Sequence, residues 1–181
     1  CIVFFVQLND TENNEESYNQ TVEVSVSKPD KMRDSVALKV GSSSVLLNDK
    51  LFSIDPKDET IITKVINNEV FVPSDVFSNV FKGEVSWNEE LKELVLRYNN
   101  KAVILKEKDR EMKVIDNIDE NEKIIQNSIM IVDDNVYVPL RDVAEEFGKN
   151  VFFDGDIVIL SDGETVFDSK NDKGLIGELL E

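Results

Sequence analysis

The chain has 181 residues, of which 41% are hydrophobic, so it is long enough to bury one full core or two small ones. Its formal net charge of −17 opposes binding to phosphate backbones and anionic lipid, which makes nucleic acid and bare membrane surfaces poor partners. The absence of histidine removes the usual general base, the Ser-His and Cys-His nucleophile pairs and most zinc sites, so we predict no enzyme activity and no cofactor.

Residues 1–35 are predicted to be a signal remnant or a largely disordered tether. Residues 1–8 are mostly apolar but too few to cross a bilayer, which takes about 20 residues. They fit the end of a signal-peptide hydrophobic region, a lipoprotein start with a lipidated Cys1, or an ordinary strand. Residues 9–34 are acidic and rich in amides, which indicates a linker, although alternating Val22, Val24 and Val26 would suit one edge strand.

Residues 36–98 alternate between strand-like and helix-like patterns. Short apolar runs flank Asn48-Asp49 and Asn67-Asn68, whose residue types tolerate the positive φ of hairpin turns. Helical spacing of apolar residues predicts a short helix over residues 75–81, and a further hairpin follows between residues 85 and 98.

Residues 102–160 follow a similar order. A hairpin turns at Lys108-Asp109, residues 116–122 are acidic and polar and are predicted to form an exposed loop, and a second hairpin turns at Asp133-Asp134. Apolar residues then fall at helical spacing over residues 140–147 until Gly148 ends the helix, and a last hairpin turns at Asp154-Gly155.

The two segments match in register and predict an internal repeat. Pro73 and Pro139 are 139 − 73 = 66 residues apart, and Trp87-Asn88 matches Phe153-Asp154 at the same offset from its proline. One copy of about 60 residues would be marginally stable alone, so the two copies should share a core. We predict an α+β fold of antiparallel sheets wrapped around short helices, with each copy, 36–98 and 102–160, wrapping its own helix.

The second copy carries the pattern V-P-L-R-x-V-x-E-x-(L/F)-G-x-x-V-x-(W/F)-D. The chain thus resembles the copper amine oxidase N-terminal domain-like, or stalk, domain of secreted and cell-surface proteins of Gram-positive bacteria, over residues 36–160. The first copy keeps Pro73 and Trp87 but has Ser74-Asp75 where the pattern has Leu-Arg. The matching residues of the second copy, which the resemblance implies are structural, are Val138, Pro139, Leu140, Arg141, Val143, Glu145, Gly148, Val151 and Asp154.

The resemblance implies a non-catalytic extracellular or cell-surface domain, since this domain is not the oxidase itself. A copper site of the oxidase type needs imidazole ligands, which this chain lacks. Three functions stay open: a structural or adhesive module with a protein partner, a module that binds cell-wall glycan or another polysaccharide, and an enzyme that uses carboxylates alone. An exposed aromatic groove would favour the second function, and two carboxylates facing each other across a cleft would favour the third. The aromatic candidates for sugar stacking are Trp87, Tyr98, Tyr137, Phe152 and Phe153.

Two further segments have alternative interpretations. Asp154, Asp156 and Asp162 with their neighbours could hold calcium in adjacent turns, but they lack the regular spacing of a calcium loop, so turn chemistry is favoured. The tail, residues 161–181, ends in a one-sided apolar stripe that predicts a short helix. This helix either docks on the domain or extends from it, as a handle for a partner or the start of a further element.

Overall fold

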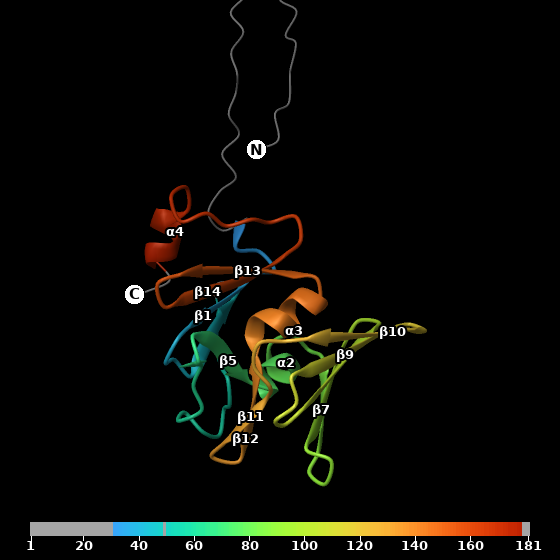
Figure 1. Cartoon of the computed structure of the whole chain (residues 1–181). Helices are drawn as coiled ribbons and strands as arrows, with labels where there is room; N and C mark the ends of the chain where they lie inside the picture. Colours follow the sequence, from blue (N-terminus) through green and yellow to red (C-terminus); the bar gives the residue numbers. More distant parts are fainter. Residues whose placement is uncertain (1–30, 49, 179–181) are drawn as a thin grey trace, which may run out of the picture.

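The computed structural model describes residues 31–48 and 50–178, so the alternatives for Cys1 and the strand predicted at residues 22–26 lie outside the described residues. The described chain forms an α+β fold dominated by antiparallel strands, as the sequence predicts (Figure 1). It contains three short helices, α2 (Asp75–Asn79), α3 (Leu140–Glu146) and α4 (Lys173–Glu178). Within these ranges, no helix combines the length and apolar character that crossing a bilayer requires.

The strands form three sheets. The tail sheet has the order β13 (Lys149–Asp154), β14 (Ile157–Asp162), β1 (Val36–Lys39), β2 (Ser44–Leu47) and β3 (Lys50–Ser53). The meander sheet has the order β10 (Asp119–Ile124), β9 (Glu111–Asp116), β8 (Lys101–Lys106), β7 (Glu93–Tyr98) and β6 (Glu84–Asn88). The central sheet has the order β11 (Met130–Val132), β12 (Asn135–Pro139), β5 (Glu69–Pro73) and β4 (Lys64–Ile66).

The strand order is symmetric about the pairing of β5 with β12. Val72 lies opposite Val138, and 138 − 72 = 66 residues is also the spacing between the two prolines. Pro73 lies opposite Tyr137, and Pro139 lies opposite Phe71. Residues at matching positions in the two segments therefore face one another in the way that equivalent residues do across a two-fold axis.

The prediction that each copy wraps its own sheet around its own helix is wrong. The three strands β1 to β3 come from the first segment but join β14 of the second, whereas β8 to β10 come from the second segment but join β7 of the first. Only two residues, Asn99 and Asn100, separate β7 from β8, and Asn99 has φ 53°. A turn this short pairs β7 with β8 as neighbouring antiparallel strands, so β8 joins the sheet of the first segment. β14 of the second segment pairs with β1 instead.

The prediction of an exposed loop at residues 116–122 is also wrong, because β9 and β10 form a hairpin there. Its turn is Asn117-Ile118, with Asn117 at φ 56°. Every side chain of β10 is exposed, so the strand has no apolar alternation for a sequence pattern to detect. Backbone pairing with β9 forms this strand, together with the ion pair between Lys113 Nζ and Glu120 Oε1 at 2.5 Å.

The main core lies where the three sheets meet the helices α2 and α3, which occupy the centre of the molecule in Figure 1. Phe77 of α2 and Phe147 at the end of α3 contact each other with ring centroids 6.2 Å apart. Helices of five and seven residues do not persist alone in water. Packing therefore stabilises both helices, and Leu140, Val143 and Val76 are fully buried.

A second, smaller core joins the tail to the outer face of the tail sheet. Phe167, Leu175 and Ile176 pack in one cluster with Ile157 and Ile159 of β14. Of the two alternatives for the tail, the structure shows the docked one, although Leu179 and Leu180 of the apolar stripe lie outside the described residues.

The segment just before β1 is packed, whereas the sequence suggests tether up to residue 35. Met32 is 3% exposed in the smaller core, Ser35 is buried, and Lys31 Nζ lies 2.6 Å from Asp172 Oδ2. Apolar contact with the docked tail holds Met32 in place, and this contact is invisible to a local composition argument.

Candidate binding groove

The predicted motif residues of the second copy form the junction between β12 and α3. Val138, Leu140 and Val143 are fully buried, and Pro139 caps α3 with φ −65° and ψ 111°. Proline ends the strand ladder at this position because it has no N–H to donate. Gly148, at φ 76°, follows the helix in the left-handed conformation that glycine adopts without strain.

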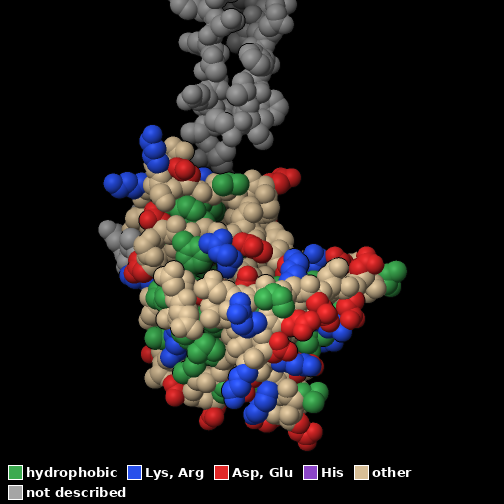
Figure 2. All heavy atoms as spheres, in the orientation of Figure 1, with side chains coloured by type: hydrophobic (Ala, Val, Ile, Leu, Met, Phe, Trp, Pro, Cys, Tyr) green, Lys and Arg blue, Asp and Glu red, His purple; other side chains and the backbone are tan. Residues whose placement is uncertain are grey.

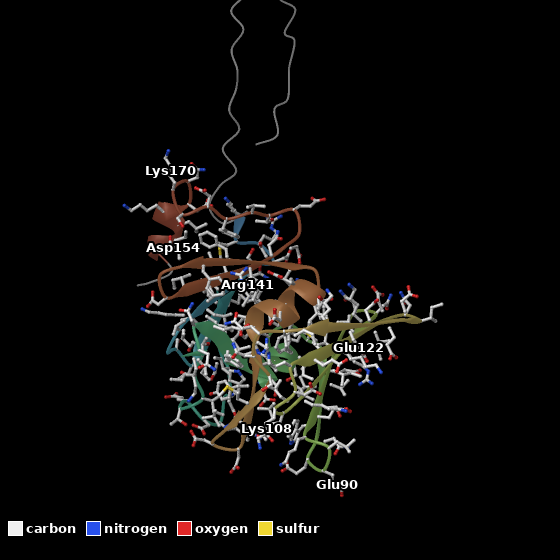
Figure 3. The ribbon with its side chains drawn as sticks, in the orientation of Figure 1. Glu90, Lys108, Glu122, Arg141, Asp154 and Lys170 are labelled. Atoms are coloured by element: carbon white, nitrogen blue, oxygen red, sulfur yellow. The ribbon has the colours of Figure 1, made fainter. Side chains whose placement is uncertain are left out.

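Arg141 is an exposed member of the motif, and Figure 3 labels it on α3. Its guanidinium carbon lies 4.7 Å from the centroid of the Phe153 ring, and Nη1 lies 3.3 Å from Glu145 Oε1. Arg141 therefore stacks on the hairpin that follows the helix, which is a structural role.

The first copy lacks this stacking arrangement, since Asp75 stands at the position that corresponds to Arg141. Trp87, which corresponds to Phe153, is half-buried against the main core, and its indole N–H donates to Glu89 Oε2 at 2.7 Å. Trp87 does not line the hollows described below.

Most of the aromatic candidates for sugar stacking are core residues. Tyr137 is 2% exposed, donates its hydroxyl to the Ile62 carbonyl at 3.1 Å, and has a pKa raised mainly by burial. Phe152 and Phe153 lie on opposite faces of the tail sheet, and both faces are covered. Phe153 packs on the main core, while Phe152 packs 6.1 Å from Phe167 of the docked tail, which covers the other face of the sheet.

Phe152 lines a hollow of about 320 Å³ between β13 and the docked tail, and Tyr98 lines a second open hollow. Three chain reversals meet there: the turn between β7 and β8, the turn between β9 and β10, and the end of α3. We name this hollow of about 240 Å³ the turn groove. Its lining residues are Tyr98, Asn99, Asn100, Lys101, Asp116, Asn117, Phe147 and Gly148.

One wall of the turn groove is aromatic, because the rings of Tyr98 and Phe147 meet edge to face with centroids 5.6 Å apart. The other wall is polar. The Asn117 backbone N–H donates to the Asn100 carbonyl at 3.4 Å, which ties the two hairpin turns together. Within the described part of the chain, the side-chain amides of Asn99 and Asn100 make no hydrogen bond, so they are open to a ligand.

The charged groups at the groove are already paired. Lys101 Nζ lies 3.5 Å from Asp116 Oδ2, and Asn117 donates its side-chain amide to Asp116 Oδ1 at 2.9 Å. Lys149 lies 5.5 Å above the Tyr98 ring and bonds to Asp162 at 2.5 Å. Burial opposes the charge on Lys149, but the contacts with Asp162 and Tyr98 outweigh burial and raise its pKa.

A narrow apolar crevice adjoins the groove and shares Tyr98 and Phe147 with it. Its free volume is about 10 Å³, and Phe77, Phe81 and Leu96 contribute to its lining. That volume is at the lower limit for one water molecule, and an apolar hollow of this kind stays dry. The mouth of the crevice therefore adds apolar surface to the wall of the groove.

A pair of facing carboxyl groups escapes the sequence analysis, because Glu69 and Asp142 belong to different elements, β5 and α3. Desolvation raises the pKa of both groups. Asn127 donates to Glu69 Oε2 at 2.6 Å, whereas Asp142 Oδ2 is buried without a donor among the described residues. Asp142 gains a hydrogen-bond donor when the carboxyl group of Glu69 is protonated. This hydrogen bond raises the pKa of Glu69 further and offsets part of the rise in the pKa of Asp142.

This carboxyl pair does not meet the condition set for the enzyme hypothesis. That condition requires a cleft between the two groups, and neither Glu69 nor Asp142 lines the hollows described here. The pair is a feature of the junction between the central sheet and α3.

The calcium hypothesis fails on geometry. Asp154 lies at the turn of the last hairpin, as Figure 3 shows, while Asp162 pairs with Lys149 at its open end. Asp154 lies opposite Ile157, and the five residue steps from Ile157 to Asp162 place Asp154 and Asp162 roughly 17 Å apart along the hairpin. Within residues 31–48 and 50–178, no three Asp, Glu, Cys or His side chains gather where they could hold a metal ion.

The antiparallel α+β fold and the motif at its strand-helix junction agree with the family that the sequence resembles. Residues 59–160 match the family model of the copper amine oxidase N-terminal domain, so the chain belongs to this family. The match confirms the family suggested by the motif, and the domain of this family is a non-catalytic part of those oxidases. A search of curated proteins and a search of solved structures each gave no match.

Proposed function

We propose that this chain is a non-catalytic interaction module displayed outside the cell or on its surface. The observation that carries the proposal is that the two ends of the described chain lie together at the tail sheet. Lys31 before β1 and Asp172 before α4 are joined at 2.6 Å, and Figure 1 shows both ends of the described chain at this sheet. A domain held at one place presents its remaining surface, including the turn groove, to a partner.

We infer further that the two segments are copies of one unit. The 66-residue spacing of the prolines and the pairing of Val72 with Val138 support this inference. Exchange of three strands between the copies makes one interlocked body.

Surface labelling of intact cells tests where the module acts. We expect an antibody against the full chain to bind intact producing cells, and protease added outside to remove that signal. Signal that emerges only after lysis would contradict the proposal.

Co-sedimentation of the full chain with isolated Gram-positive cell wall tests what the module binds. The net charge of −17 makes any contact with basic polymers sensitive to salt. Retention that survives 1 M salt supports a specific wall-binding site. Retention that disappears in salt, or none at all, leaves a protein as the partner.

A second candidate function is polysaccharide binding. The turn groove favours it, because the groove combines an aromatic wall with uncommitted amides.

A further inference from the structure

We propose that the turn groove binds a neutral 2-acetamido sugar of a glycan. In this arrangement, the pyranose ring lies against Tyr98 and Phe147, Asn99 and Asn100 bind its hydroxyl groups, and the acetamido methyl packs against the mouth of the apolar crevice. The inference rests on the polysaccharide-binding candidate above and gives it residues and a sugar class.

The two walls of the groove match the two kinds of surface that a pyranose presents. Its C–H face is apolar and packs on aromatic side chains, as at the half-buried pair Tyr98 and Phe147. Its hydroxyl groups both donate and accept, and so does a side-chain amide. Asn99 and Asn100 offer two such amides that have no partner among the described residues.

The demands of tight turns explain only some of the asparagine and aromatic residues that line the groove. Asn99 and Asn117 have φ 53° and 56°, a conformation that asparagine tolerates better than most residues. Asn100 has no positive φ, and turn chemistry does not require the aromatic wall beside it. A ligand contact accounts for both features together.

Charge points to a neutral ligand. Lys101 is paired with Asp116, and Lys149 is paired with Asp162, so neither cation is left to bind a phosphate or a uronic acid. The volume of about 240 Å³ lies below the range of about 300–1,000 Å³ typical of drug-sized ligands, which suits one sugar ring.

The crevice distinguishes acetamido sugars from plain hexoses. It shares Tyr98 and Phe147 with the groove, and its lining is mostly apolar, so its mouth offers an apolar contact to a methyl group. A hydroxyl placed there would lose its hydrogen bonds with water. We therefore expect glucose units to bind less well than N-acetylglucosamine units.

Two soluble tetrasaccharides test the proposal on the full wild-type chain. Chitotetraose carries an acetamido group on each ring, and cellotetraose has the same linkage without it. We expect chitotetraose to shift the amide NMR signals of residues 98–101 and 147–149, and cellotetraose to bind at least tenfold more weakly. Equal binding of the two sugars, shifts confined to another surface, or no shift at millimolar chitotetraose would overturn it.

Variants locate the contact. Asn100→Ala should weaken chitotetraose binding at least tenfold, whereas Asn121→Ala, an exposed asparagine on β10 outside the groove, should bind as wild type. Tyr98→Phe keeps the ring and should retain most of the affinity. Wild-type affinity in Asn100→Ala would contradict the proposal.

The same variant separates this inference from the wider proposal. If Asn100→Ala still sediments with cell wall at high salt but wild type ignores chitotetraose, the module binds wall through another surface. In that outcome, the proposed function stands and the groove inference fails.

Discussion

The tail sheet and the meander sheet each have five antiparallel strands in an equivalent order, with β13, β14, β1, β2 and β3 corresponding to β6, β7, β8, β9 and β10. They differ in whether the face that points away from the main core is covered. In the tail sheet, all residues of β14 from Ile157 to Ser161 are buried, because the main core covers one face and the docked tail covers the other. In the meander sheet, β9 alternates between buried residues such as Met112 and half-exposed residues such as Lys113. One topology thus supports a sheet buried on two faces and a sheet buried on one.

The free edges of the two sheets differ in the same way. β10, the edge of the meander sheet, is fully exposed and mostly charged, and Figure 2 shows acidic and basic side chains together over the projecting arm that it forms with β9. β3, the corresponding edge of the tail sheet, exposes Leu51 by 75% and Phe52 by 38%. Charged side chains oppose pairing of β10 with another chain, whereas β3 has one charged residue, Lys50, beside two exposed apolar ones.

The docked tail gives the largest expected effect. Phe167→Ala removes a buried ring that contacts Phe152, and we expect it to lower the free energy of unfolding by about 3 kcal/mol. Urea denaturation followed by circular dichroism measures the change. Val166→Ala is the matched control, since Val166 is 68% exposed and its loss should be nearly neutral. Equal effects of the two substitutions would show that the tail does not cover the sheet.

Glu69→Gln should stabilise the protein at neutral pH, by roughly 1 kcal/mol at most because water screens a half-buried site. The pKa of Glu69 is raised in the fold, mainly by desolvation, so the folded state holds a proton that the unfolded state releases. The stability of the wild type therefore falls as pH rises from the ordinary range of glutamate through this raised pKa.

Glutamine removes that dependence, because its amide donates to Asp142 at every pH and its oxygen still accepts from Asn127. Thermal unfolding from pH 4 to pH 8 measures how the stability of each protein changes with pH. A variant with the slope of the wild type would contradict the shared-proton arrangement. Glu145→Gln, on the exposed face of the same helix α3, is the control.

Arg141→Ala tests the stacking that the first copy lacks. We expect a loss of about 0.5 kcal/mol, the range of an exposed cation–π contact. Arg141→Lys keeps the charge without the planar group. In urea denaturation, its free energy of unfolding should therefore lie between those of the wild type and Arg141→Ala. A loss in Arg141→Lys as large as in Arg141→Ala would assign the effect to planar stacking alone, and no loss in either would remove the stacking role.

Leu51→Lys should leave the free energy of unfolding within about 0.5 kcal/mol, as exposed substitutions do. It should slow aggregation on heating, because it replaces an exposed apolar residue of the edge strand β3 with a charged one. Light scattering during a temperature ramp measures this. Ile124→Lys makes the same change on the edge that is already charged, and an equal slowing there would break the contrast between the edges.

The sequence predicts the local features of this fold well. Asn67-Asn68 and Asp133-Asp134 do form hairpin turns with positive φ, and Gly148 does end α3, because turn chemistry and helix periodicity depend on near neighbours. The strand β10 escapes prediction because none of its side chains is buried. The exchange of strands escapes it because β1 and β14 lie at opposite ends of the domain in sequence.

The candidate site is less accessible to sequence reasoning. Tyr98 is among the aromatic candidates, but Phe147 looks like a core residue and Asn99-Asn100 like an ordinary turn. Only the fold brings these three chain reversals together. A Tyr-Asn-Asn run is a weak signal, since turn chemistry alone accounts for most such sequences.

The exchange of strands also sets the order in which the chain can fold. Val36 pairs with Leu160, and 160 − 36 = 124 residues separate them. Contacts this distant in sequence form slowly, so we expect refolding on a timescale of milliseconds to seconds or longer. During synthesis, β1 to β3 wait for β14, and Leu38 and Val45 remain exposed to water until then. The tail sheet can therefore be completed only after β14 has been synthesised, whereas the meander sheet, whose strands β6 to β10 are consecutive in sequence, needs no such distant partner.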